Sequence, residues 1–238
     1  MTRTAPSTRT AVLSTAVAVA GTGSLLLVGN VLKPNVGESL PAYFIYQAVA
    51  LAIAGVVVVA MRLVTGSWPT LLGRGKPSAP SRAVRLLGVA EGESWRRVGT
   101  TFVVIVSAVT ATYLGLTYWS TGLAAVPPTG WLFAIGLAIP LSVSNAFIEE
   151  LITRWTVAEG FGTVGALARY APWASALIFG GVHYFGVPAG IVGSIMAGFL
   201  AWFSTRSIQD TGGIWWAWSI HFVQDILIFS VLLTRFFV

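Results

Sequence analysis

Long apolar runs recur along this chain, and they restrict it to one class of fold. A helix that crosses a lipid bilayer needs about 20 mostly apolar residues. Seven runs approach that length, at residues 11–32, 42–65, 98–119, 131–154, 172–187, 189–205 and 214–234. The fifth and sixth are short and flank Pro188, so six spans is an alternative. Because backbone polar groups in lipid must be bonded internally, the sequence predicts an all-α polytopic transmembrane helix bundle of about seven spans, within a range of six to eight.

The composition supports a membrane protein and excludes several other classes. Only 9% of the residues are charged, against roughly 25% in soluble domains. The net charge of +6 comes from residues in the loops between apolar runs, where it indicates membrane topology and no nucleic-acid partner. The chain has no cysteine, which excludes disulfides, cysteine-ligated zinc and a cysteine nucleophile.

The longest polar stretch, residues 66–97, carries most of the information on topology. It contains six Lys and Arg residues but only Glu91 and Glu93 as acidic residues. An excess of Lys and Arg marks cytoplasmic loops, so we expect this stretch and the N-terminus to be cytoplasmic in a multi-pass protein of the cell membrane. We divide the chain into residues 1–97, the N-terminal spans with the basic loop, and residues 98–238, a second membrane domain.

Two carboxylates and an arginine lie in the fourth apolar run. Glu150 and Arg154 are four residues apart and share a helix face, whereas Glu149 points elsewhere. The spacing therefore predicts that Arg154 neutralises Glu150 and leaves Glu149 free. A simpler interpretation is a helix end at which these charges meet the lipid headgroups.

Both histidines of the chain also lie in apolar runs. His183 follows Phe179 by four residues, and His221 precedes Asp225 by four, so that imidazole and carboxylate share one helix face. A single histidine in such a place is more often a helix-packing residue. However, ionisable groups within a bilayer are costly and indicate function. We expect Glu149, His183 and His221 to converge on one polar cavity that opens toward the cytoplasm.

The three motifs together resemble those of the CPBP family of intramembrane proteases, also called Abi, which includes type II CAAX prenyl proteases and bacteriocin-immunity proteins. The resemblance covers roughly residues 131–234 and implies that residues 98–238 form a catalytic membrane domain similar to that of the CPBP family. Its matching positions are Glu149, Glu150, Arg154, Phe179, His183, His221 and Asp225.

The resemblance implies an intramembrane endopeptidase that hydrolyses a membrane-associated or prenylated peptide. Glu149 with His183 would activate a water molecule, and His221, with or without Asp225, would stabilise the tetrahedral oxyanion. The other two residues of the first motif, Glu150 and Arg154, would hold the site together. No serine or cysteine nucleophile is required.

This chain departs from the family pattern in its third motif, where well-known prenyl proteases have Asn in place of Asp225. An ionised Asp cannot donate a hydrogen bond to an oxyanion. Asp225 is therefore either protonated or orients His221.

Metal dependence is open at the level of the sequence. Glu149, His183 and His221 are residue types that bind zinc, but the H-E-x-x-H signature is absent. We favour a metal-free glutamate mechanism without a cofactor.

Two other functions remain as alternatives. A proton-coupled transporter would also bury ionisable groups in its spans, but it would more often show inverted repeats. A catalytically inactive immunity or scaffold protein would keep the fold while tolerating loss of Glu149. No pattern in the sequence specifies an oligomeric state.

Overall fold

The computed structural model describes residues 7–36, 39–66, 68–119, 122–186 and 189–237. Within these ranges the regular structure is helical, apart from two isolated β-bridges that join Pro80 to Ser94 and Val84 to Val89. Pro188 lies outside the described residues. The prediction of an all-α polytopic bundle is confirmed.

The helices follow the apolar runs closely, and most begin or end at a residue suited to that position. Pro41 lies in the first turn of the second helix, and Gly66 ends that helix with a φ of 69°, a left-handed conformation that glycine adopts without strain. Ser94 caps the third helix by accepting from Arg96 N. The α-helices are α1 (Thr8–Val36), α2 (Leu40–Thr65), α3 (Trp95–Tyr118), α4 (Pro128–Glu150), α5 (Thr156–Phe161), α6 (Ala171–Val182), α7 (Gly190–Thr211) and α8 (Trp215–Leu233).

Among the described residues, six helical segments are long and apolar enough to cross a membrane, a number within the range of six to eight expected from the sequence. The difference from seven spans lies in residues 172–187. This run forms α6, which has 12 residues and continues as a short 3₁₀ turn, His183–Phe185. Its α-helical part alone rises about 18 Å, which is short of the roughly 30 Å thickness of a bilayer core, and a 3₁₀ turn at Ala168–Tyr170 extends it at the other end. The described residues therefore contain six spans and one shorter helical segment, which is the six-span alternative that the sequence leaves open.

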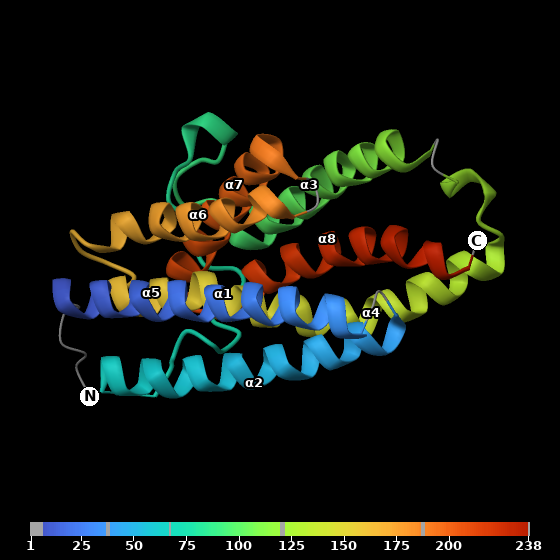
Figure 1. The fold of residues 1–238 in the computed structure, drawn as a ribbon. Coiled ribbons are helices and arrows are strands. Elements are labelled where there is room, and N and C mark those ends of the chain that lie inside the picture. The colour runs from blue at the N-terminus through green and yellow to red at the C-terminus, as the bar shows by residue number, and fades with distance from the viewer. Residues whose placement is uncertain (1–6, 37–38, 67, 120–121, 187–188, 238) are drawn as a thin grey trace.

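The arrangement of the helices brings the sequence motifs together (Figure 1). α1 packs along α2, α8 packs along α4, and α6 pairs with α7. Gly180 and Gly198 allow α6 and α7 to approach closely, since a Cβ at Gly180 would lie 2.7 Å from Ser194 O. α4 continues through a π-helical turn, Leu151–Trp155, into α5, so the fourth span runs from Pro128 to Phe161.

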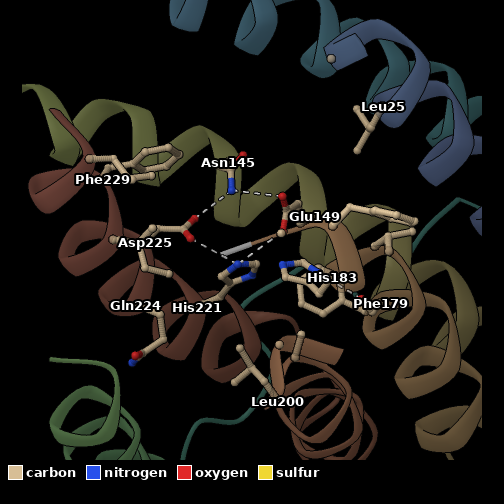
Figure 2. Close-up of a pocket in the computed structure, with 18 of the residues that line it drawn as sticks. Leu25, Asn145, Glu149, Phe179, His183, Leu200, His221, Gln224, Asp225 and Phe229 are labelled. Atoms are coloured by element: carbon tan, nitrogen blue, oxygen red, sulfur yellow. Dashed lines mark hydrogen bonds and ion pairs between the residues drawn. The ribbon is translucent and has the colours of Figure 1, made fainter. Parts of the chain in front are cut away.

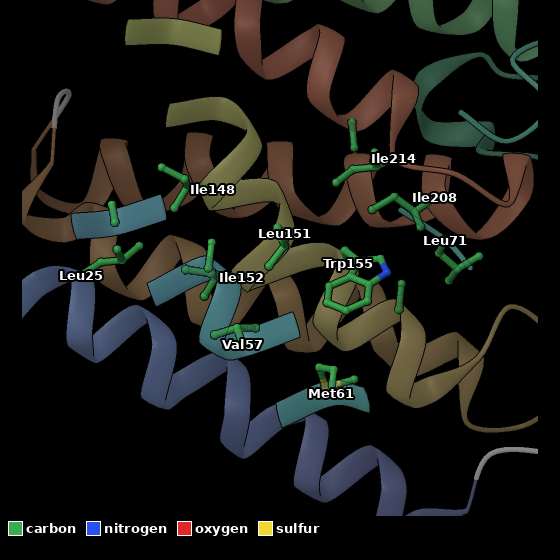
Figure 3. Packing of buried hydrophobic residues seen from close by; sticks show 14 residues of the cluster. Leu25, Val57, Met61, Leu71, Ile148, Leu151, Ile152, Trp155, Ile208 and Ile214 are labelled. Atoms are coloured by element: carbon green, nitrogen blue, oxygen red, sulfur yellow. The ribbon is translucent and has the colours of Figure 1, made fainter. Parts of the chain in front are cut away.

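The largest apolar core joins the N-terminal helices to the motif-bearing span (Figure 3). Val57 and Met61 of α2 pack near Ile152 and Trp155, which belong to the π-helical turn. Ile152 and Trp155 are fully buried. The first two helices therefore support the segment that carries Arg154.

The basic stretch after α2 is folded against the corner between α7 and α8. Lys76 N donates to Thr211 O at 2.8 Å, and Ile214 N donates to Gly73 O at 3.0 Å. Arg82 pairs with the buried Asp210, with Nε 2.5 Å from Oδ1. The segment therefore connects the N-terminal helices to the C-terminal half of the chain.

Candidate active site

The first motif lies where α4 changes into the π-helical turn. Glu150 and Arg154 form an ion pair, with Arg154 Nη1 3.2 Å from Glu150 Oε1 and both side chains 0% exposed. This is the pairing that the four-residue spacing predicts. Thr153, in the same turn, bonds to Glu149 O at 2.6 Å and accepts from Arg154 Nη1 at 3.0 Å. π-helical turns within α-helices often occur at functional sites, and this one begins directly after Glu150.

Glu149 lies at the wall of a cavity, and its two oxygens have different partners. Oε1 accepts from Asn145 Nδ2 at 3.2 Å. Oε2 lies 3.5 Å from His221 Nε2, and the side chain is 22% exposed, compared with 0% for Glu150. Glu149 is thus separate from the buried ion pair, as predicted, but it has polar neighbours and is not free of contacts.

His221 connects all three carboxylates of the site. Its Nδ1 lies 2.8 Å from Glu150 Oε1, and its Nε2 lies 3.4 Å from Asp225 Oδ1 and 3.5 Å from Glu149 Oε2. Asp225 Oδ2 accepts from Asn145 Nδ2 at 3.0 Å. Carboxylate oxygens face both ring nitrogens, so the arrangement suits an imidazolium ring that donates from each nitrogen.

His183 contributes a different imidazole form. Its Nδ1 lies 3.0 Å from Phe179 O. A carbonyl only accepts, so Nδ1 carries the hydrogen, and in a neutral ring Nε2 is left as an acceptor. The Phe179 ring lies between charged and aromatic neighbours: its centroid is 3.6 Å from the Arg154 guanidinium carbon, 4.0 Å from the ring of His183 and 5.7 Å from that of His221.

The predicted residues fall into two groups relative to a cavity of about 750 Å³ (Figure 2). Glu149, His183, His221 and Asp225 line this cavity. Glu150 and Arg154 do not line it and lie behind His221 and Phe179. Side chains from α4, α8 and the end of α6 therefore meet in one place, as the in-membrane placement of the motifs predicts.

The direction of the cavity differs from the expectation. Its lining reaches Asn30 near the end of α1, Tyr43 at the start of α2 and Arg235 after α8. These lie at the helix ends away from the basic stretch, which follows α2 and contacts the start of α8. The cavity thus extends away from the segment that we assign to the cytoplasm, contrary to the expectation that it opens on that side.

Glu149, His183 and His221 are the residues that could bind a metal ion according to the sequence. Among the described residues, no group of three or more His, Asp or Glu side chains has the geometry to hold a metal ion. His221 Nδ1 is engaged by Glu150, and its Nε2 faces two carboxylates. Metal-free chemistry stays a prediction, which metal analysis of the purified chain checks.

Two side chains at the site were not identified from the sequence. Asn145 donates to both Glu149 and Asp225, and Gln47 of α2 donates from Nε2 to Asn145 Oδ1 at 3.2 Å. Asn145 lies four residues before Glu149, a spacing that could have identified it. Gln47 carried no such signal, because its contact joins residues 98 positions apart.

Comparison with known proteins agrees with this geometry. Residues 130–227 match the sequence model of a family described as type II CAAX prenyl endopeptidase Rce1-like. The matched segment contains all three motifs, from Glu149 to Asp225. No curated protein and no solved structure matched the chain.

Proposed function

We infer that residues 130–227 form an Rce1-like domain of the CAAX protease family, carried on a multi-span membrane protein. In this proposal the chain is an endopeptidase that hydrolyses a peptide bond of a membrane-associated substrate. A water molecule activated by Glu149 is the nucleophile. The observation that carries the proposal is the position of Glu149 at the cavity wall, beside His221 and apart from the buried ion pair.

Glu149 would act as the general base. Peptide hydrolysis requires a base within hydrogen-bond reach of water, and Glu149 Oε2 is not bound by the Asn145 amide. Glu149 is also the most exposed site carboxylate, at 22% compared with 8% for Asp225. The proton taken from water would pass to the amine that leaves when the C–N bond breaks.

The two histidines would divide the remaining work. His183 Nε2, an acceptor when the ring is neutral, would help to position the water. His221 Nε2–H would donate to the oxyanion that forms on the carbonyl oxygen. Asp225 would act ionised, because donors face both of its oxygens, and would orient His221.

Glu150 and Arg154 would hold this arrangement in place without contacting substrate. Glu150 Oε1 accepts from Arg154 Nη1 and from His221 Nδ1, so one oxygen fixes both partners. Arg154 also stacks on Phe179, whose carbonyl fixes His183. The pair thereby sets the orientation of both imidazoles.

The substrate is proposed to be a peptide segment at the membrane, and the family description makes a prenylated C-terminal peptide the first candidate. A cavity of about 750 Å³ lies in the size range of sites that enclose small ligands and peptide segments. Its wall combines the polar site with apolar side chains such as Leu25, Met196 and Phe229. Such a wall suits a substrate with an apolar part.

The test compares the purified chain with Glu149→Gln on a fluorogenic prenylated C-terminal peptide. The matched control is Glu91→Gln, which changes an exposed carboxylate in the basic stretch. We expect cleavage by the wild-type chain and by the control, none by Glu149→Gln, and no effect of a metal chelator. Cleavage by Glu149→Gln at the wild-type rate would refute the role of the base, and loss of activity with chelator would refute the metal-free mechanism.

A further inference from the structure

The carboxamide of Asn145 lies between two carboxylates of the site. Its Nδ2 donates to Glu149 Oε1 at 3.2 Å and to Asp225 Oδ2 at 3.0 Å. Both acceptors are carboxylates, and an amide oxygen turned toward them would be repelled, so the orientation of the amide is determined by its neighbours. An NH₂ group has two hydrogens, and each has one partner here.

Gln47 fixes the other end of the same amide. Its Nε2 donates to Asn145 Oδ1 at 3.2 Å, and its side chain is buried in α2. Within the described residues, Gln47 Oε1 is buried without a hydrogen-bond partner. Leaving a buried oxygen without a partner costs free energy. Gln47 has this orientation nonetheless, with its amide NH₂ directed at Asn145 Oδ1.

From this geometry we propose that Asn145 is a positioning residue for Glu149 and Asp225, and that Gln47 orients it. The amide holds Glu149 by Oε1, so Oε2 is the oxygen that lies beside His221 Nε2. It also places a neutral donor between two carboxylates that both lie within 3.5 Å of the same imidazole nitrogen. Asn145 acts through these side chains and takes no part in the bond changes.

The contact between Gln47 and Asn145 extends the site beyond the segment that matches the family. Gln47 lies in α2, outside residues 130–227. The N-terminal helices thus contribute one polar contact to the catalytic arrangement, in addition to the apolar packing of Val57 and Met61. The expected effects on kcat and KM rest on the proposed peptidase function. The hydrogen-bond geometry of Asn145 is tested separately, by thermal stability.

The experiment measures kcat, KM and thermal stability for pairs of substitutions at each position. Asn145→Leu removes the donor, and we expect kcat to fall about 10²-fold with KM unchanged, as for a misplaced catalytic group. Asn145→Asp has nearly the size of the native residue but adds a third carboxylate between Glu149 and Asp225. We expect it to be worse than Asn145→Leu in both kcat and thermal stability.

The same order is expected at the second position. Gln47→Met removes the donor to Asn145 Oδ1, whereas Gln47→Glu offers an acceptor that would turn the amide away from the carboxylates. Gln47→Glu should therefore lose more activity than Gln47→Met. The control is Gln209→Met, which removes a buried amide that bonds to Arg82, Gly162 and Ala168 away from the cavity, and should lower stability without changing kcat per folded molecule.

If Asn145 only fills space, Asn145→Asp should be closer than Asn145→Leu to the wild type in kcat and thermal stability. That result would overturn the proposal. So would an Asn145→Leu variant with wild-type kcat. If the wild-type chain cleaves no substrate, the proposed function fails, but the order of thermal stability at Asn145 still decides whether the amide separates two carboxylates.

Discussion

Glutamine substitutions at the two adjacent glutamates should have opposite consequences. Glu149→Gln is expected to abolish cleavage with a stability change of less than about 1 kcal/mol, because the side chain is partly exposed and a glutamine oxygen still accepts from Asn145. Glu150→Gln leaves Arg154 as a buried charge without its counter-ion. Removing one partner of a buried pair costs about 3–5 kcal/mol.

The structure places the loss for Glu150→Gln near the lower end of that range. A glutamine oxygen can still accept from Arg154 Nη1 and from His221 Nδ1, which Glu150 Oε1 serves now. A loss of about 3 kcal/mol lowers the Tm of a chain of this size by about 6–12 °C. The assay is thermal unfolding of detergent-solubilised protein, with cleavage measured on the same preparations.

The control is the double variant Glu150→Gln with Arg154→Met, which removes the unpaired charge but keeps a long apolar side chain against Phe179. Replacing both partners of a buried pair is often neutral or stabilising, so the double variant should be more stable than Glu150→Gln alone. Equal Tm losses for Glu149→Gln and Glu150→Gln would refute the division of roles, as would full activity of Glu149→Gln.

Three further predictions follow from the remaining contacts. Asp225→Asn should lower kcat about 10²-fold, because an amide has one acceptor oxygen where Asp225 has two, facing His221 and Asn145, whereas an active variant that lacks the alkaline fall-off of the wild type would show that Asp225 acts as a neutral donor. Ser78→Cys introduces the only cysteine in an exposed position of the basic stretch, so it should resist an impermeant thiol reagent in intact cells, and labelling without permeabilisation would reverse the topology. Asp210→Asn should destabilise the fold by about 1.5–3 kcal/mol and expose the stretch to limited proteolysis, because Arg82 loses its charged partner, and an unchanged Tm would contradict that anchor.

The sequence predicted the fold class and the residues of the three motifs because both depend on local spacing. Apolar run length identifies spans, and a four-residue separation places Glu150 beside Arg154 and His221 near Asp225. The choice between six and seven spans depends on residues 172–187, where the apolar run exceeds the α-helix. The helix ends at Val182, and the following 3₁₀ turn contains His183.

The contacts that the sequence did not predict are those between distant helices. Gln47 reaches Asn145 only because α1 and α2 pack against the fourth span, and no local pattern in α2 records that packing. The contact of Glu150 with His221 was missed for the same reason, since 71 positions separate the two residues. The four-residue spacing predicts only the pairing of Glu150 with Arg154. In the folded chain, the same oxygen of Glu150 contacts both Arg154 and His221.

The balance of charge at the site supports the choice of Glu149 as the base. Glu150 Oε1 has two close nitrogen neighbours, His221 Nδ1 at 2.8 Å and Arg154 Nη1 at 3.2 Å. Glu149 has a neutral amide at 3.2 Å and only a distant imidazole nitrogen, at 3.5 Å. Glu150 is also 0% exposed and does not line the cavity, so water in the cavity does not reach it. The carboxylate with the weakest neutralisation is thus the one at the cavity wall, where water and a peptide carbonyl can reach it, and this coincidence is the reason for proposing Glu149 over Glu150.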